Sequence, residues 1–173
     1  MAGTQLYLGI KNGVVVCVDR YYGYDLSGYF YHSYSRDPVY FDDGAGLLKK
    51  LENLFDVLNF PQPATSERYF ESQSNGKKHG THKVERPYEF RKNRNSEREK
   101  VMSDNDILGK HGDAGTFIVR VQQRQNSSWQ GRITWVDEDK TVYFRSVFEM
   151  MKLIDEALNT ACGETDNKEA TWQ

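Results

Sequence analysis

The sequence predicts an α+β protein made of two β-β-β-α repeats, each with an antiparallel sheet and one helix, related by a pseudo-twofold axis. Three observations predict this fold. The chain matches itself at a fixed offset, each matching part contains strands with apolar residues at every second position, and each ends in an apolar stripe with helical spacing.

The internal match is found when the chain is shifted by the 103 positions that separate Gly28 from Gly131. Residues 14–55 then align with residues 117–158 without a gap, and seven of the 42 positions are identical. Roughly two or three identities are expected from average composition. The identities include the tripeptides Val39-Tyr40-Phe41 and Val142-Tyr143-Phe144.

Three strands are expected in each half. In the first strand one face is apolar, at Val14, Val16 and Val18 and at Phe117, Val119 and Val121. The second strand repeats this pattern, at Leu26, Gly28, Phe30 and His32 and at Trp129, Gly131, Ile133 and Trp135. A hairpin loop joins these strands, and Gly23 and Asn126 tolerate the positive φ that such loops require. The tripeptide Val-Tyr-Phe forms the third strand.

A helix follows the third strand in each half. Asp43 is expected to cap the first helix, and Ser146 with Glu149 has the spacing of a capping box at the second. Helical apolar stripes follow, at Leu47, Leu48, Leu51, Leu54, Phe55 and Leu58 and at Phe148, Met151, Ile154, Leu158 and Ala161.

The domain boundaries follow from these patterns. We predict a first module at residues 1–62, a basic polar linker at 63–113, a second module at 114–163 and a disordered tail at 164–173. Because so small a unit has a marginal core, the modules are expected to pack together. They would form one combined antiparallel sheet covered by both helices, or pair through their edges, which would also allow a homodimer.

Charge is segregated along the chain, although the formal net charge is only -2. Residues 65–100 hold ten Lys or Arg and six Glu, whereas the remainder holds 13 basic and 19 acidic residues. The basic segment is consistent with a solvated connector. It is also consistent with an arm that contacts nucleic-acid phosphates, with these candidate residues: Lys77, Lys78, Arg91, Lys92 and Arg94.

The outward sheet face is the second candidate surface. Period-two alternation predicts that Tyr21, Tyr29 and Tyr31 point outward in the first half, and Arg120, Gln122, Arg124, Gln130, Arg132 and Thr134 in the second. Tyrosine and arginine are enriched at recognition surfaces. The alternative interpretation is that the tyrosines cover the other module or form cross-strand ladders.

Several functional classes lack support in the sequence. No apolar run is long enough to span a membrane, and the first residues have neither a basic leader nor a long apolar stretch, so we expect a cytoplasmic protein. Cys17 and Cys162 are isolated, and His79 and His82 have no third ligand nearby. We therefore predict no enzyme, no metal site and no cofactor.

The segments RQNSSWQG, FRSVFEMMKLIDEAL and LFDVLNFPQP resemble small uncharacterised proteins from mobile elements of gut-dwelling Gram-positive bacteria. Proteins of this size and habitat are similar to inhibitors of bacterial defence, including anti-CRISPR proteins. The resemblance implies no catalytic residues. It covers most of residues 14–62 and 115–160 and leaves the linker uncovered.

The predicted function is therefore a non-catalytic inhibitor that binds a host defence nuclease, most concretely a CRISPR effector, and blocks nucleic-acid loading or cleavage. Acidic groups on the modules would face basic grooves of the nuclease, with candidates in one turn at Asp137, Glu138 and Asp139. The alternative is a regulator that binds DNA or RNA through the linker and the sheet arginines.

Overall fold

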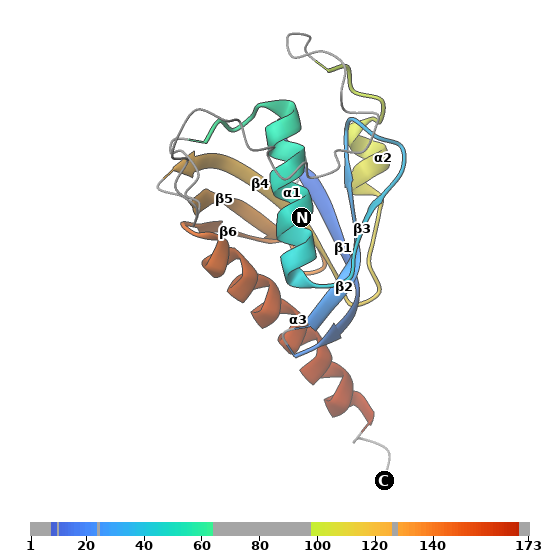
Figure 1. Cartoon of the computed structure of the whole chain (residues 1–173). Coiled ribbons are helices and arrows are strands. Elements are labelled where there is room, and N and C mark those ends of the chain that lie inside the picture. Colours follow the sequence, from blue (N-terminus) through green and yellow to red (C-terminus); the bar gives the residue numbers. More distant parts are fainter. Residues whose placement is uncertain (1–7, 10, 24, 64–97, 126–127, 170–173) are drawn as a thin grey trace.

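The computed structural model describes residues 8–9, 11–23, 25–63, 98–125 and 128–169 (Figure 1). These residues form a mixed α+β fold with one six-stranded antiparallel sheet and three helices, which confirms the α+β class predicted from the sequence. The strands lie in the order β3-β2-β1-β4-β5-β6.

The elements follow the chain in a simple order. The first half contains β1 (Val14–Tyr22), β2 (Asp25–His32), β3 (Val39–Phe41) and α1 (Gly44–Leu58). The second half contains α2 (Asp104–Leu108), β4 (Gly115–Gln125), β5 (Ser128–Trp135), β6 (Lys140–Phe144) and α3 (Val147–Glu169). Helix α3 thus extends beyond residue 163, where the sequence places the end of the second module.

The two halves meet at the centre of the sheet, where β1 and β4 pair antiparallel from Val14 opposite Val119 to Val18 opposite Gly115. Of the two arrangements that the sequence allowed, the structure has the single combined sheet. Both halves consequently contribute side chains to the same core.

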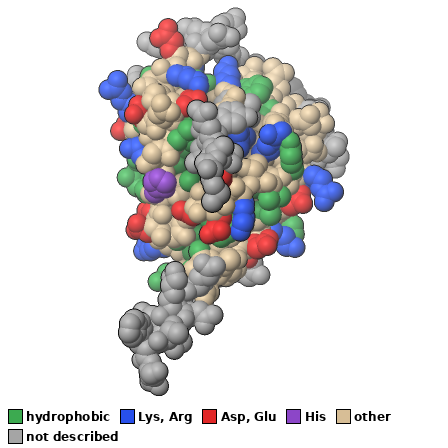
Figure 2. All heavy atoms as spheres, turned by 180° about the vertical axis from the view of Figure 1, so that it is seen from behind, with side chains coloured by type: hydrophobic (Ala, Val, Ile, Leu, Met, Phe, Trp, Pro, Cys, Tyr) green, Lys and Arg blue, Asp and Glu red, His purple; other side chains and the backbone are tan. Residues whose placement is uncertain are grey.

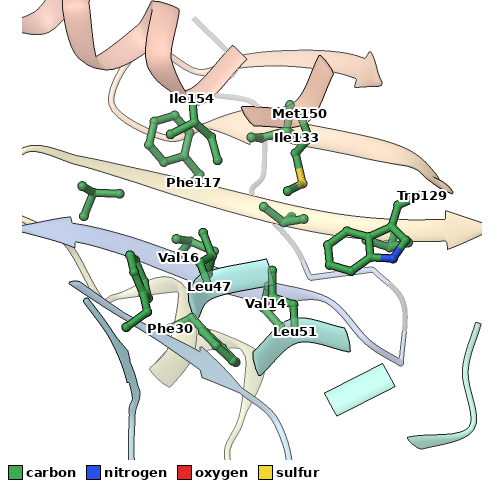
Figure 3. Packing of buried hydrophobic residues seen from close by; sticks show 14 of the residues in the cluster. Val14, Val16, Phe30, Leu47, Leu51, Phe117, Trp129, Ile133, Met150 and Ile154 are labelled. Atoms are coloured by element: carbon green, nitrogen blue, oxygen red, sulfur yellow. The ribbon is translucent and has the colours of Figure 1, made fainter. Parts of the chain in front are cut away.

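Helices α1 and α3 lie on the same face of this sheet (Figure 1). Leu47 and Leu51 of α1 point toward Val14 and Val16 of β1, whereas Met150 and Ile154 of α3 lie over β5 and β4 (Figure 3). The core also takes the large side chains of Phe30, Phe55, Phe117, Phe144 and Trp129. This buried apolar surface is the main stabilising contribution to the fold.

A smaller core lies on the opposite face. There, Leu8 and the α2 residue Ile107 pack against side chains of the two central strands, Val15, Cys17 and Ile118. Ile107 is fully buried, although the sequence analysis placed it in the linker. Ser103 caps this one-turn helix by accepting a hydrogen bond from the Asp106 backbone N–H at 3.2 Å.

The expected helix caps are present. The Asp43 carboxylate accepts a hydrogen bond from the Gly46 N–H at 2.6 Å, and the Ser146 hydroxyl accepts one from the Glu149 N–H at 3.0 Å. Glu149 completes the start of α3 by accepting a hydrogen bond from the Arg145 N–H at 2.6 Å, a bond that lowers the pKa of its carboxyl. These caps satisfy donors that the first helical turn leaves unpaired.

The first strand of each half carries a register irregularity, between Val18 and Arg20 in β1 and between Val121 and Gln123 in β4. An extra residue in a strand reverses which face the following side chains occupy. The outward orientation predicted for Tyr21 and Arg124 is therefore wrong, because both lie beyond the irregularity and point toward the helices.

Among the described helices, none is both long and apolar enough to cross a bilayer.

Glycine is required at one position in each half, where the second strand lies very close to the backbone of the first. A Cβ at Gly28 would collide with the Cys17 carbonyl oxygen, and a Cβ at Gly131 with the Arg120 carbonyl oxygen.

We expect Gly131→Ala to lower the free energy of unfolding by about 2 kcal/mol, because a methyl group there must displace backbone. Urea unfolding measures this change. Gly163→Ala is the control, since nothing lies within 4 Å of its Cβ, and an equal loss there would contradict the argument.

His32 makes the stability depend on pH. Its imidazole is buried at the end of β2, where Nδ1 accepts a hydrogen bond from the Tyr34 N–H at 3.2 Å. Burial, with a smaller contribution from Arg98, lowers the pKa of His32 to about 4. Between pH 6.5 and 4 the unfolded chain thus binds the additional proton, so stability is complete above this window and falls as the pH falls through it.

We expect a loss of about 3 kcal/mol across this window, measured by urea unfolding at pH 7, 5.5 and 4. His32→Gln should flatten the profile, because no imidazole remains to titrate at this position. The control is His111→Gln, which removes an imidazole at an exposed position. Equal profiles for the wild-type chain and His32→Gln would refute the assignment.

Candidate binding surfaces

The sheet face opposite α1 and α3 carries two polar and aromatic clusters on either side of the smaller core. We call the first the tyrosine corner, formed by Tyr29, Tyr31 and Tyr40. We call the second the arginine corner, formed by Arg120, Arg132 and Tyr143. Cross-strand pairs share a face, so the pairing of these residues fixes their common orientation.

The tyrosine corner is a set of edge-to-face ring contacts. The ring centroid of Tyr29 lies 5.7 Å from that of Tyr31 and 5.8 Å from that of Tyr40. The Tyr29 hydroxyl donates to the His111 carbonyl oxygen at 3.0 Å, and the Lys110 ammonium lies 5.1 Å from the Tyr31 ring centroid. Burial raises the pKa of Tyr29 to about 12, so the hydroxyl remains a neutral donor. Tyr40 leaves 64% of its surface exposed at the edge.

The arginine corner combines a stacked guanidinium with a hydroxyl ladder. The Arg132 guanidinium carbon lies 4.5 Å from the centroid of Tyr143, whose side chain is 60% exposed. Arg120 donates to the Thr134 hydroxyl at 2.8 Å, and Thr134 bonds to the Thr141 hydroxyl at 2.8 Å. The Nε of Arg132 is buried and has no hydrogen-bond partner within the described part of the chain. A planar guanidinium that lies on an aromatic ring can contact a protein side chain or stack on a nucleobase.

Charge on this side of the molecule is mixed. Figure 2 shows basic, acidic and hydrophobic side chains interspersed over the described part of this view, with no large area of one sign. A surface without a dominant field gives little electrostatic attraction for a polyanion. Recognition here would depend on shape and on aromatic and guanidinium contacts.

Arg124 has a structural position at the junction of the two halves. Its guanidinium, 4% exposed, lies 2.7 Å from both Glu52 and Asp56 of α1 and donates to the Pro61 carbonyl oxygen at 2.6 Å. The indole N–H of Trp129 donates to the second Glu52 oxygen at 2.7 Å. Arg124 thus joins β4 to α1 and does not contribute to the outward face.

Tyr21 has the corresponding role in the first half. Its hydroxyl donates to the Asp155 carboxylate of α3, and burial together with this hydrogen bond raises the pKa of Tyr21 to about 12. Tyr21 and Arg124 are 103 positions apart, as are Glu52 and Asp155. Each first strand therefore contacts an acidic residue on the helix of the other half.

The acidic turn between β5 and β6 is used in part by the fold. Asp137 accepts hydrogen bonds from the Thr116 N–H at 2.9 Å and the Trp135 indole N–H at 3.1 Å. Glu138 lies 3.4 Å from the Lys140 ammonium, and Asp139 adopts a φ of 50° in the turn. Asp137 thus has a structural role, although all three carboxylates of this turn are exposed.

A shallow cavity of about 370 Å³ lies beside the junction, between the end of α1 and the end of β4. Side-chain amides dominate its lining, at Asn59, Gln62, Gln122, Gln123 and Gln125. Arg124 also lines the cavity; its Nε and Nη1 are bonded, whereas its Nη2 is buried without a hydrogen-bond partner among the described residues. The cavity therefore offers neutral amides beside one guanidinium nitrogen.

The remaining candidates are placed as follows. The predicted linker residues lie outside the described part of the chain, as do the two closely spaced histidines: Lys77, Lys78, Arg91, Lys92, Arg94, His79 and His82. Within the described residues, no group of three His, Cys, Asp or Glu could hold a metal ion. Burial raises the pKa of the Cys17 thiol to about 12, which keeps it protonated and unreactive.

Three residues of these surfaces were not among the binding residues predicted from the sequence: Tyr40, Tyr143 and Lys110. The signal for the tyrosines was present, since each lies between the two apolar residues of a Val-Tyr-Phe strand and alternation turns it outward. Lys110 had no comparable signal, because it reaches the sheet from the loop that follows α2.

No protein-family model, no curated protein and no solved structure matches this chain.

The junction yields a stability test. We expect Arg124→Met to lower the free energy of unfolding by about 2 to 3 kcal/mol, because it leaves Glu52 and Asp56 without their shared cation and the Pro61 carbonyl without a donor. Urea unfolding at pH 7 measures the change. Lys100→Met removes the exposed 3.0 Å ion pair with Asp104 and should cost well under 1 kcal/mol. Equal losses in the two variants would contradict the proposed role of the junction.

Proposed function

We propose that this chain is a non-catalytic protein that binds a protein partner through the tyrosine and arginine corners. The observation that carries the proposal is the exposure of Tyr40 and Tyr143, each held against a neighbouring ring or guanidinium on the same sheet face. Rigid aromatic rings give contact area at a small entropic cost and are enriched at the centres of protein interfaces.

A protein partner fits this face better than a nucleic acid. Nucleic-acid surfaces that bind without sequence preference combine aromatic platforms with a continuous basic groove. The aromatic part is present here, but acidic side chains are interspersed with the basic ones (Figure 2). The guanidinium of Arg132 and the hydroxyls of the tyrosines instead suit the mixed polar and apolar chemistry of a protein surface.

We further propose that the two halves are copies of one β-β-β-α unit related by a pseudo-twofold axis. Three features support this duplication at the 103-residue offset. The register irregularities fall at equivalent positions, the contacts Tyr21–Asp155 and Arg124–Glu52 are equivalent, and the cross-strand pairs Tyr29–Tyr40 and Arg132–Tyr143 are equivalent. The two corners then have the same geometry with different chemistry.

The identity of the partner rests on the sequence resemblance. We propose a defence nuclease, most concretely a CRISPR effector, whose loading or cleavage would be blocked by occupation of its surface. Glu138 and Asp139 are exposed acidic groups that could face basic residues of such a partner. Binding of DNA or RNA through the basic segment is the alternative that the same experiment tests.

We expect the full chain to capture a purified CRISPR effector, measured by biolayer interferometry, and Tyr40→Ala/Tyr143→Ala to weaken capture at least tenfold. The physical reason is the loss of two exposed ring anchors. Tyr22→Ala removes a tyrosine that is exposed but belongs to neither corner and should have no effect.

The same proteins are titrated against labelled single-stranded and duplex DNA over a range of salt concentrations. Binding to DNA that weakens steeply with salt, and weakens further when Lys77, Lys78, Arg91, Lys92 and Arg94 are changed to Ala, would favour the nucleic-acid alternative. If neither the effector nor DNA binds, both functions are wrong.

A further inference from the structure

The two outer strands of the sheet, β3 and β6, differ in how their free edges are protected. An edge strand presents unpaired N–H and C=O groups, to which another strand can add. Natural proteins cover or interrupt such edges with proline, lysine or short strands. A long edge with no such protection is a site for strand pairing.

The β3 edge is protected. The strand has three residues, Pro38 precedes it, and the Lys50 ammonium of α1 donates to the Tyr40 carbonyl oxygen. Proline removes a donor and the lysine occupies an acceptor, so little of this edge remains for another strand.

The β6 edge is protected less. Its one lysine, Lys140, stands at the first of its five positions, and the ammonium lies 5.4 Å from the Trp135 ring centroid and 3.4 Å from Glu138. Lys140, Thr141, Val142 and Tyr143 are all exposed. The positions 103 residues after Pro38 and Lys50 are Thr141 and Leu153, neither of which can block the edge as proline and lysine do. Among the described residues, no side chain hydrogen-bonds the backbone of this strand.

Exposed apolar side chains lie along the same edge. Val142 is 45% exposed and Phe148, in the first turn of α3, is 70% exposed. Val142 points to the helix side of the sheet, because it pairs with Ile133 of the main core. A strand that added to β6 would remove part of this apolar surface from water.

We propose that β6 pairs antiparallel with β6 of a second copy of this chain, with Val142 opposite Val142. This register is self-complementary. Thr141 then lies opposite Tyr143 of the second copy. Asp139, in the turn before β6, and Arg145, directly after β6, flank the strand, so each of these carboxylates comes near the guanidinium of the other copy, twice in the dimer. Opposite charges at the ends of two paired strands favour association.

Two properties favour this contact between copies. The Arg145 side chain is 88% exposed and its guanidinium lies 3.6 Å from Glu149, a distance that marks a weak ion pair. A formal net charge of only -2 keeps the repulsion between two copies small. The resulting sheet has twelve strands and ends at a protected β3 edge on each side.

The experiment is sedimentation velocity of the full chain from 1 to 200 μM. We expect reversible dimerisation, and Val142→Lys should weaken it at least tenfold by placing a charge on the two-fold axis next to its copy. Arg145→Asp should also weaken it about tenfold, because it places two carboxylates near each other. Adding Asp139→Asn to Arg145→Asp should restore part of the affinity, since Asn removes the repulsion and tolerates the positive φ.

Disulfide trapping tests the register independently. In a Cys162→Ser background, which removes the exposed native thiol, Val142→Cys should form a covalent dimer on mild oxidation. Tyr40→Cys, exposed on the protected edge, is the matched control and should remain monomeric.

A chain that is monomeric at all concentrations overturns the proposal, and so does a dimer that Val142→Lys leaves unchanged. Preferential trapping of Tyr40→Cys would place the contact at the other edge. Neither measurement requires an effector, so the dimer can be refuted while effector capture, measured by interferometry, is observed, although Tyr143 belongs to both surfaces.

Discussion

The antiparallel pairing of β1 with β4 is the constraint on which the rest of the structure depends. Each half supplies only three strands and one helix, and a unit of that size has too little buried surface to be stable alone. Pairing the two first strands removes two exposed edges and places α1 and α3 over one continuous core. The same pairing also creates a second, smaller core beneath α2.

The register irregularities next to this central pair determine how the halves are joined. Each turns the end of a first strand toward the helices, so that Tyr21 reaches Asp155 and Arg124 reaches Glu52. Because these contacts cross between halves, neither half can be displaced without breaking them. The buried guanidinium also fixes geometry, since it binds two carboxylates and a backbone carbonyl at once.

The sequence predicted the strands, the helices and their caps, because apolar periodicity and the capping residues Asp43 and Ser146 act locally. It did not predict the irregularities, since a single inserted residue leaves the apolar pattern before it intact. Arg124 was consequently placed on the wrong face.

Ile107 was missed for a different reason, because one turn of helix is too short to show a period. Ser103 and Asp106 nevertheless have the spacing of a helix cap. Of the candidate surfaces, Tyr29, Tyr31, Arg120 and Arg132 were predicted from the sequence. Tyr40 and Tyr143, which are more exposed, were interpreted only as evidence of the repeat.

If the halves are copies, the pattern of differences between them bears on function. Positions that face the shared core are restricted by packing, so Val16 and Val119 or Phe41 and Phe144 can vary little. Positions on the open face carry no such restriction, and there Tyr29 corresponds to Arg132 and Tyr31 to Thr134. The edges differ in the same way, with Lys50 protecting β3 and Leu153 leaving β6 open. A symmetric scaffold with unlike surfaces can engage two different neighbours at once. The open β6 edge suits a second copy of the chain, and the tyrosine corner, at the far end of the sheet, remains accessible to another protein.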